Sequence, residues 1–378
     1  MLHAKLSASG AKKWINCPLS VLLESKMPNE ETSYAKEGTK AHELSELKLK
    51  RELNLIGKES YDIEISKFDY DDEMDKYTDY YCDAVLEIVH KYDRNYSMVK
   101  LEEKVDFSPW VPEGFGTSDV IVLSDKVLEI IDLKYGKGVK VYADNNPQLM
   151  LYALGVLNDY NYICDIEEIN LTIVQPRLDN ISSFKINVYD LLEWGEDIKV
   201  KALKAYNADG DCVVGKHCDD GFCKARPICK AYADERLKIA KYDFRDPAEL
   251  SADDIADILG SVDELVRWSK TIKDYALSKA LAGEEYKGFK IVEGRSNRAF
   301  NIDDLEVIKL LTKEGYRESD VCETTLKSLS SIEKMIGKKD FKDILGNHVI
   351  KPMGKPTLVP IDDVRPVYNS AINDFNNI

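Results

Sequence analysis

Residues 116–136, GTSDVIVLSDKVLEIIDLKYG, contain two apolar runs with charged side chains at their ends. Both runs are rich in Val and Ile, which favour β-strands, and the Ser-Asp-Lys turn between them is typical of a hairpin. Side chains alternate between the faces of a strand, so Asp132 and Lys134 share one face. If the strands pair through this turn, their register places Asp119 beside Asp132. The segment therefore predicts paired strands with two carboxylates and an amine close together.

Segments with helical and strand patterns surround this hairpin. The spacing of apolar residues predicts helices over 7–25, 35–55, 72–93, 146–158 and 190–208, and strands over 99–105, 168–176 and 183–189. Strands flanked by helices in this order predict an α/β fold with a mixed central sheet.

The length of the chain, 378 residues, favours two or three domains. We place a boundary near residue 245, in a polar stretch. The first domain, 1–245, would contain the sheet. The second, 246–378, is expected to be a mostly helical C-terminal extension with a long helix over 251–282 and one hairpin over 286–300.

The composition is that of a globular protein with an acidic surface. The chain has 52 Lys and Arg against 68 Asp and Glu, a net charge of −16. This charge argues against a protein that coats nucleic acid non-specifically, but it allows an enzyme that grips DNA in one basic groove. The sequence has neither an apolar run of about 18 residues nor the apolar stretch of a secretory signal. We therefore expect a soluble intracellular protein without membrane contact.

Two carboxylates a few ångströms apart repel each other unless a cation lies between them. Carboxylate oxygens suit Mg²⁺ or Mn²⁺, and the carbonyl of Leu133 is a further candidate ligand. Beside such an ion, Lys134 would orient a water molecule or stabilise charge on a phosphate, as in phosphodiester hydrolysis. The alternative is a surface salt-bridge group, because Asp-x-Lys alone is common. The position of Asp132 at the end of an apolar strand, where the chain leaves the core, favours the metal site.

The motifs Gly-x-x-Asp, Asp-x-Lys and Gln-x-x-x-Tyr follow one another here, ending in Gln148 and Tyr152. This order resembles the RecB-like branch of the PD-(D/E)xK nucleases. The resemblance implies a restriction-endonuclease-like core in which Asp119 and Asp132 bind metal with Lys134 beside them. It also implies that Gln148 and Tyr152 lie near that lysine and the DNA backbone.

The same family has an upstream helix with the pattern Gly-x-x-x-His-x-x-x-Glu, which EGTKAHELSE matches through His42 and Glu46. Residues four apart lie on one helix face. By resemblance, His42 would be a metal ligand and Glu46 a supporting carboxylate, although a single His on a helix is more often a surface or core residue. Glu103, in VKLEEKV, is a further acidic candidate for the site.

Four of the eight cysteines fall between residues 212 and 229, and such bunching in a reducing cytosol favours a metal site over disulfides. Cys218, Cys223 and Cys229 have the spacing C-x4-C-x5-C, and Cys17 lies far upstream. A zinc ribbon would need two close C-x2-C pairs, which this chain lacks.

One distant cysteine and a downstream trio resemble the iron–sulfur nucleases, the AddB-like group and the CRISPR-associated four-cysteine nuclease. The resemblance implies that Cys17, Cys218, Cys223 and Cys229 bind a [4Fe-4S] cluster that clasps the two ends of the nuclease core. The trio in that family is usually C-x2-C-x5-C, so Cys212 is a rival ligand. Zn²⁺ in place of the cluster and ordinary free cysteines remain alternatives.

The C-terminal third has a local excess of positive charge in KGFKIVEGRSNRAF. Lys290, Arg295 and Arg298 are candidates to contact DNA phosphates, with a solvated hairpin as the alternative. This part of the chain also resembles an uncharacterised phage and prophage family.

Together these features predict a metal-dependent DNA nuclease, expected to be an exonuclease, in phage recombination or replication in the cytoplasm of a bacterial host. DNA is the expected partner, along with recombination or replication proteins, and the oligomeric state is left open. One alternative is a catalytically silent DNA-end-binding or scaffold protein on the same fold. Another is a metal-dependent hydrolase of smaller phosphate esters.

Overall fold

The computed structural model of the chain describes residues 4–28, 33–160, 165–237, 252–296, 298–321, 326, 328–352, 354, 356–360 and 364–368. The chain divides into two compact units, 1–258 and 259–378. The boundary expected near residue 245 falls outside the described residues.

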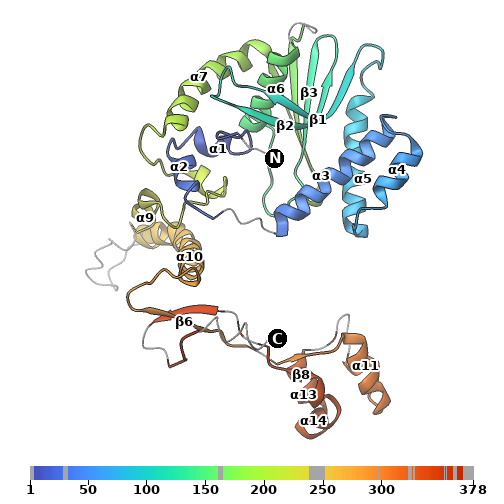
Figure 1. The fold of residues 1–378 in the computed structure, drawn as a ribbon, viewed down its shortest axis with the longest axis vertical. Coiled ribbons are helices and arrows are strands. Elements are labelled where there is room, and N and C mark those ends of the chain that lie inside the picture. The colour runs from blue at the N-terminus through green and yellow to red at the C-terminus, as the bar shows by residue number, and fades with distance from the viewer. Residues whose placement is uncertain are drawn as a thin grey trace. The chain divides into compact units, whose positions relative to one another are not determined.

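The first unit is built on a five-stranded sheet in the order β1-β2-β3-β4-β5 (Figure 1). The strands are β1 (Met98–Asp106), β2 (Phe115–Leu123), β3 (Val127–Leu133), β4 (Glu168–Gln175) and β5 (Asn180–Asn187). Neighbouring strands run antiparallel except β3 and β4, which are parallel. This arrangement confirms the predicted mixed α/β sheet.

The register of the β2–β3 hairpin agrees with the sequence prediction. Val120 pairs with Ile131 and Leu123 with Leu128. Continuing this register by one residue places Asp119 opposite Asp132, at the end of the sheet where β3 ends.

Helices cover both faces of the sheet (Figure 1). On one face, α3 (Ser33–Glu52) and α5 (Asp72–Val89) pack through Leu49 and Val85 against Ile131 and its neighbours. On the other face, α6 (Pro147–Tyr160) and α7 (Val188–Asn207) pack against Ile130 and its neighbours. Odd and even residues of β3 therefore bury against different helices, as alternation requires. Further elements of this unit are α1 (Ala11–Trp14), α2 (Ser20–Glu24), α4 (Lys58–Ile65), η1 (Pro176–Leu178), α8 (Lys216–Asp219) and α9 (Lys230–Arg236).

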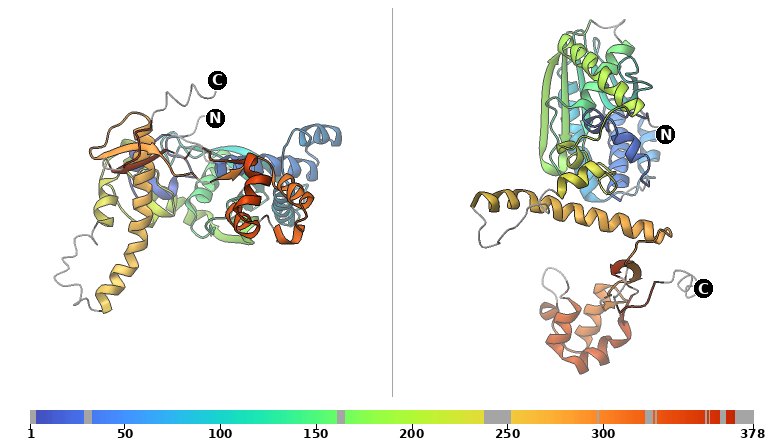
Figure 2. Two further views of the ribbon diagram at one scale, coloured as in Figure 1. Left: turned by 90° about the horizontal axis from the view of Figure 1, so that it is seen from below. Right: turned by 90° about the vertical axis from the view of Figure 1, so that its left-hand side faces the viewer.

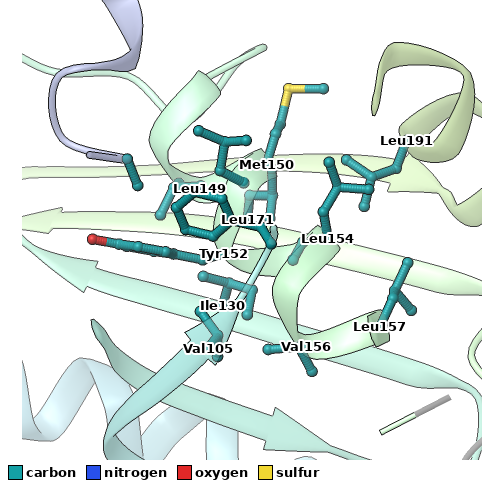
Figure 3. Packing of buried hydrophobic residues seen from close by; sticks show 14 of the residues in the cluster. Val105, Ile130, Leu149, Met150, Tyr152, Leu154, Val156, Leu157, Leu171 and Leu191 are labelled. Carbon is teal, nitrogen blue, oxygen red and sulfur yellow. The ribbon is translucent and has the colours of Figure 1, made fainter. Parts of the chain in front are cut away.

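Helix α6 lies directly on the sheet, and Figure 3 shows its apolar side chains packed over Val105 and Ile130. The close approach requires a glycine, because a Cβ atom at Gly155 would lie 2.9 Å from the Cβ of Val105. We expect Gly155→Ala to lower the free energy of unfolding by about 1–3 kcal/mol. Gly38→Ala is the matched control in α3, where a Cβ meets no atom within 4 Å, and should raise it by up to about 1 kcal/mol. Urea unfolding measures both, and equal stability of the two variants would refute the packing argument.

The single helix predicted over residues 7–25 is wrong, because the chain forms two short helices, α1 and α2, with Cys17 and Pro18 between them. Proline lacks an N–H and disfavours helical backbone in the preceding residue, so the helix ends there. The break leaves Cys17 in the irregular segment between the two helices instead of on a helix face. Trp14 is buried against the core, and its Nε1 donates to the carbonyl of Ser7 at 2.9 Å.

The second unit is mostly helical, as predicted. Its helices α11 (Asp304–Lys313), α12 (Glu318–Val321), α13 (Leu329–Ile336) and α14 (Lys338–Leu345) share one apolar core, and the short helix η4 (Gly346–His348) follows them. Helix α10 (Ala252–Leu281), a continuous helix in Figure 2, includes the point at which the two units divide.

The hairpin predicted over residues 286–300 is wrong. Strand β6 (Phe289–Glu293) pairs with β9 (Pro356–Pro360), and β7 (Ala299–Phe300) pairs with β8 (Val349–Ile350). A short apolar strand has the same local pattern whether its partner is near or distant in sequence, so the pattern alone favoured the nearer partner. Among the described residues of the chain, no helix is long and apolar enough to cross a membrane.

Candidate metal centre and thiol cluster

The end of β3 and the start of α6 bring four predicted residues into one hydrogen-bonded group. The Nζ atom of Lys134 lies 2.7 Å from Oδ2 of Asp132 and donates to Oε1 of Gln148 at 2.9 Å. The amide of Gln148 donates to Oδ1 of Asp132 at 2.9 Å and to the hydroxyl of Tyr152 at 3.2 Å. Gln148 therefore fixes the positions of the carboxylate and the amine relative to each other.

Burial shapes the charge of Asp132, which is 2% exposed. Its pKa is raised above the ordinary value, chiefly by burial and against the opposing effect of the Lys134 charge. Burial likewise raises the pKa of Tyr152, so this tyrosine stays a neutral hydroxyl. A carboxylate held in such a place is stabilised by positive charge beside it.

Asp119 joins β2, β3 and helix α3. Its Oδ2 accepts a hydrogen bond from the N–H of Leu133 at 2.7 Å and lies 3.4 Å from Nδ1 of His42. Burial acts to raise the pKa of Asp119, but the charge and hydrogen bond of His42 and the Leu133 N–H lower it overall. Burial acts to lower the pKa of His42, but Asp119, with smaller effects of Asp132 and Glu102, raises that pKa to about 9. Leu133 contacts the site through its N–H, which donates to Asp119. Binding of a metal ion by the Leu133 carbonyl stays a prediction.

Glu102 is the site residue that sequence reasoning missed. Ligand atoms of His42, Glu102 and Asp119 all lie within 4.8 Å of one another. Burial and the charge of Asp119 raise the pKa of Glu102 to about 7 against the opposing effect of His42. Among the described residues, this group has the ligand types and the spacing of a divalent-cation site.

Glu103, the glutamate predicted for the site, lies on the other face of the sheet. Glu102 has a left-handed φ of 48° in the middle of β1, between paired residues on either side. Leu101 packs on the α5 side of the sheet, whereas Val105 packs on the α6 side, so the alternation reverses at Glu102. Glu103 consequently turns toward α6, where it accepts a hydrogen bond from Tyr160 at 3.0 Å. The two adjacent glutamates of a predicted strand are the sequence signal that could have identified Glu102.

A small cavity adjoins the group of His42, Glu102 and Asp119, and its lining shows whether this group suits a cation. Its lining includes Ser45, Glu46 and Tyr81. Within the described residues, the buried hydroxyls of Ser45 and Tyr81 have no hydrogen-bond partner. A buried hydroxyl without a partner is costly, and water bound to a cation would supply one. These residues therefore fit a hydrated divalent ion, and Glu46 lies where a supporting carboxylate is expected.

The two neighbouring glutamates provide a matched test of this assignment. Glu102→Gln should weaken Mn²⁺ binding by about tenfold or more, because it removes a charged ligand from a preformed group. Glu103→Gln should leave the affinity within about twofold, because Glu103 faces Tyr160. Isothermal titration calorimetry measures both constants. Equal losses for the two variants would remove Glu102 from the site.

The cysteines predicted to bind the cluster are distant in sequence, but the fold brings them close together. Cys17, Cys218, Cys223 and Cys229 line one pocket, together with other side chains from the same segments. Burial raises the pKa of Cys218, and it raises that of Cys223 to about 11. Five thiols meet here, because Cys212 contacts this group as well.

Cys212 interacts with two of the four predicted thiols. Burial, followed by the neighbouring Cys229 and Cys17, raises the pKa of Cys212 to about 12. Cys82 is buried elsewhere and donates to the carbonyl of Ser45 at 3.7 Å. Cys164 and Cys322 lie outside the described residues.

The predicted DNA contacts of the C-terminal part lie in the second unit. Arg298 forms an ion pair with Glu333 and stacks over the ring of Phe341, with 5.8 Å between the guanidinium and the ring centre. Arg298 thus has a local structural role. Lys290 lies in β6, and Arg295 is exposed beyond the end of that strand.

Comparison with known proteins gives two findings. A family described as "Protein of unknown function (DUF2800)" matches residues 3–366. Among solved structures, one titled "Crystal structure of SSO0001" is 16% identical to this chain. That match covers 60% of this chain and 86% of the other, with a TM-score of 0.27.

Proposed function

The chain belongs to the DUF2800 family, whose description states no activity, and from its own site we propose that it is a divalent-metal-dependent DNA nuclease. One observation carries the proposal. Two strand ends and one helix bring Asp119, Asp132 and Lys134 to the same place, with His42 and Glu102 at ligand distance from Asp119. Burying several carboxylates together is unfavourable unless a cation binds among them.

In this proposal, His42, Glu102 and Asp119 hold Mg²⁺ or Mn²⁺. Asp132, predicted as a further ligand, lies outside that group of three; it contacts Lys134 and Gln148 and adds negative charge beside Asp119. The ion supplies Lewis acidity and lowers the pKa of a bound water. Lys134, held by Gln148 at 2.9 Å, donates to the phosphate oxygen on which negative charge develops. Tyr152 holds Gln148 in turn, so a chain of hydrogen bonds fixes the amine before the substrate binds.

The thiol group supports the second part of the proposal, a [4Fe-4S] cluster bound by Cys17, Cys218, Cys223 and Cys229. Thiols from distant parts of the chain gather around one pocket, which suits the thiolate ligands of such a cluster. Zn²⁺ stays an alternative, because it also binds four thiolates. Cys212 remains a rival ligand because it contacts Cys229 and Cys17.

Exonuclease action, phage or prophage recombination or replication, and a place in the cytoplasm of a bacterial host rest on the sequence resemblance alone. We propose them on that basis. The site is compatible with them because its groups act on any phosphodiester that reaches Lys134.

The test is incubation of the purified protein with Mn²⁺ and linear DNA, with EDTA as the control. The proposal expects DNA cleavage that EDTA abolishes. Turnover of a small phosphate monoester without DNA cleavage would assign the site to a different hydrolase. Binding of DNA ends without any cleavage would instead identify a silent scaffold.

A further inference from the structure

One exposed loop begins and ends at the candidate metal centre. Residues 136–146 connect β3 to α6 without regular secondary structure. Lys134 and Gln148, two residues outside the two ends of the loop, are joined by a hydrogen bond of 2.9 Å. The exposed side chains near the two ends of this loop therefore lie close to the groups proposed to act on phosphate.

Two buried amides on the β4–β5 hairpin hold the main chain of this loop. The side chain of Gln175 accepts from the N–H of Val141 at 2.7 Å and donates to the carbonyl of Val139 at 3.0 Å. Asn180 donates to the carbonyl of Val141 at 3.0 Å and to the Gln175 side chain at 3.0 Å. The exposed fractions of these amides are only 2% and 8%. Their hydrogen-bonding capacity is thus devoted largely to fixing a loop.

Both ends of the loop are anchored as well. The N–H of Ala143 donates to the hydroxyl of Ser182 at 3.0 Å. Tyr135, just before the loop, is buried, and Arg177 lies over its ring at 4.9 Å. Arg177 is itself paired with Glu37 and Glu73. The loop is therefore held at its start, its middle and its end.

The solvent side of this anchored loop carries two lysines and an aromatic ring, together with the exposed side chains of Val139, Asp144 and Asn145. Lys137 and Lys140 are exposed, and Tyr142 is 59% exposed. Three residues of chain span at most about 11 Å, so the backbone of Lys137 lies within that distance of Lys134. The loop backbone is anchored, but these side chains are largely exposed. Packing of the side chains therefore does not explain why the loop is held in place.

Lysines beside an exposed aromatic ring are the combination that proteins use to bind single-stranded nucleic acid. The lysines neutralise phosphates, and a base stacks on the ring. In a chain of net charge −16, DNA must be bound by local positive groups, and this loop, which starts two residues after Lys134, carries two exposed lysines. Because the backbone is already fixed, binding loses little conformational entropy.

We propose that residues 136–146 are a strand-guiding loop that binds single-stranded DNA next to the metal centre. Lys137 and Lys140 bind consecutive phosphates, and Tyr142 stacks on a base. The proposal deepens the nuclease function above and rests on it for the identity of the substrate. It places a DNA contact in the first unit, whereas the sequence placed candidate contacts at Lys290, Arg295 and Arg298.

Binding is measured without cleavage, by fluorescence anisotropy of a labelled thymidine oligonucleotide in EDTA over a salt series. Tyr142→Ala should weaken binding between about fivefold and a hundredfold, and Tyr142→Trp should restore it. The double change Lys137→Ala with Lys140→Ala should reduce the salt slope by about 1.4, the value for two phosphate contacts on a single strand. The matched control is Tyr189→Ala, at a tyrosine that is 85% exposed on α7 and should not affect binding.

The outcomes separate this inference from the nuclease function. If the wild type binds the oligonucleotide and the loop variants lose binding, the inference holds even where Mn²⁺ elicits no cleavage, and only the nuclease proposal falls. If the wild type cleaves DNA but the loop variants bind as it does, the inference is overturned. Failure of the wild type to bind, or equal losses for Tyr142→Ala and Tyr189→Ala, also overturns it.

Discussion

Lys134→Met should lower the rate of Mn²⁺-dependent DNA cleavage by about 10²–10³ and leave the protein folded. The ammonium group of Lys134 lies 2.7 Å from Asp132, and its side chain is 27% exposed, so it can reach a bound phosphate. Methionine keeps the length and the apolar stem of the side chain but removes the charge. Single-turnover cleavage of a labelled duplex measures the rate, and circular dichroism checks the fold.

The control for this prediction comes from the same hairpin. Lys126→Met removes an ammonium group at the β2–β3 turn, where the side chain is 56% exposed and pairs with Glu167. Its cleavage rate should stay within about twofold of the wild-type rate, because surface ion pairs contribute little. Equal rates for Lys134→Met and the wild type would sink the catalytic assignment of Lys134.

Cys17→Ala should produce the largest change in stability. Losing one thiolate ligand should abolish the broad absorbance near ~400 nm expected of a bound iron–sulfur cluster. It also releases a cross-link that closes a loop of about two hundred residues, for which the chain-entropy model gives about 5 kcal/mol. Iron analysis and denaturant unfolding of anaerobically purified protein measure the two effects.

Two other cysteines sharpen this test. Cys82→Ala removes a buried thiol outside the pocket and should retain the iron. Cys212→Ser decides between the rival ligands, because loss of iron in this variant and not in Cys218→Ser would exchange their roles. A colourless wild-type protein with stoichiometric zinc would contradict the cluster.

Sequence patterns predicted those parts of the fold that local rules govern. The β2–β3 register followed from the turn, and the meeting of Asp119 with Asp132 followed from the register. Gln148 was placed near Lys134 by resemblance, and the structure joins them at 2.9 Å. Local sequence patterns and the order of the family's motifs are sufficient to place residues where side chains alternate regularly between the faces of a strand.

The errors arose where the backbone departs from regular alternation or where partners are distant. A left-handed φ at Glu102 reverses the faces of β1, so Glu102 lies in the site and its predicted neighbour Glu103 contacts Tyr160. Pro18 interrupts the helix expected over 7–25. The partner of β6 lies more than sixty residues away, at β9, and no local signal identifies it.

The meeting of Cys17 with Cys212–Cys229 has a consequence for biosynthesis. These thiols are separated by about two hundred residues, which a ribosome adds in roughly 10–40 s. For most of that interval Cys17 has left the exit tunnel while its cysteine partners have not emerged. Trp14 shares a core with α6 and can be buried earlier, but a cluster held by all of these thiols can form only after Cys229 emerges.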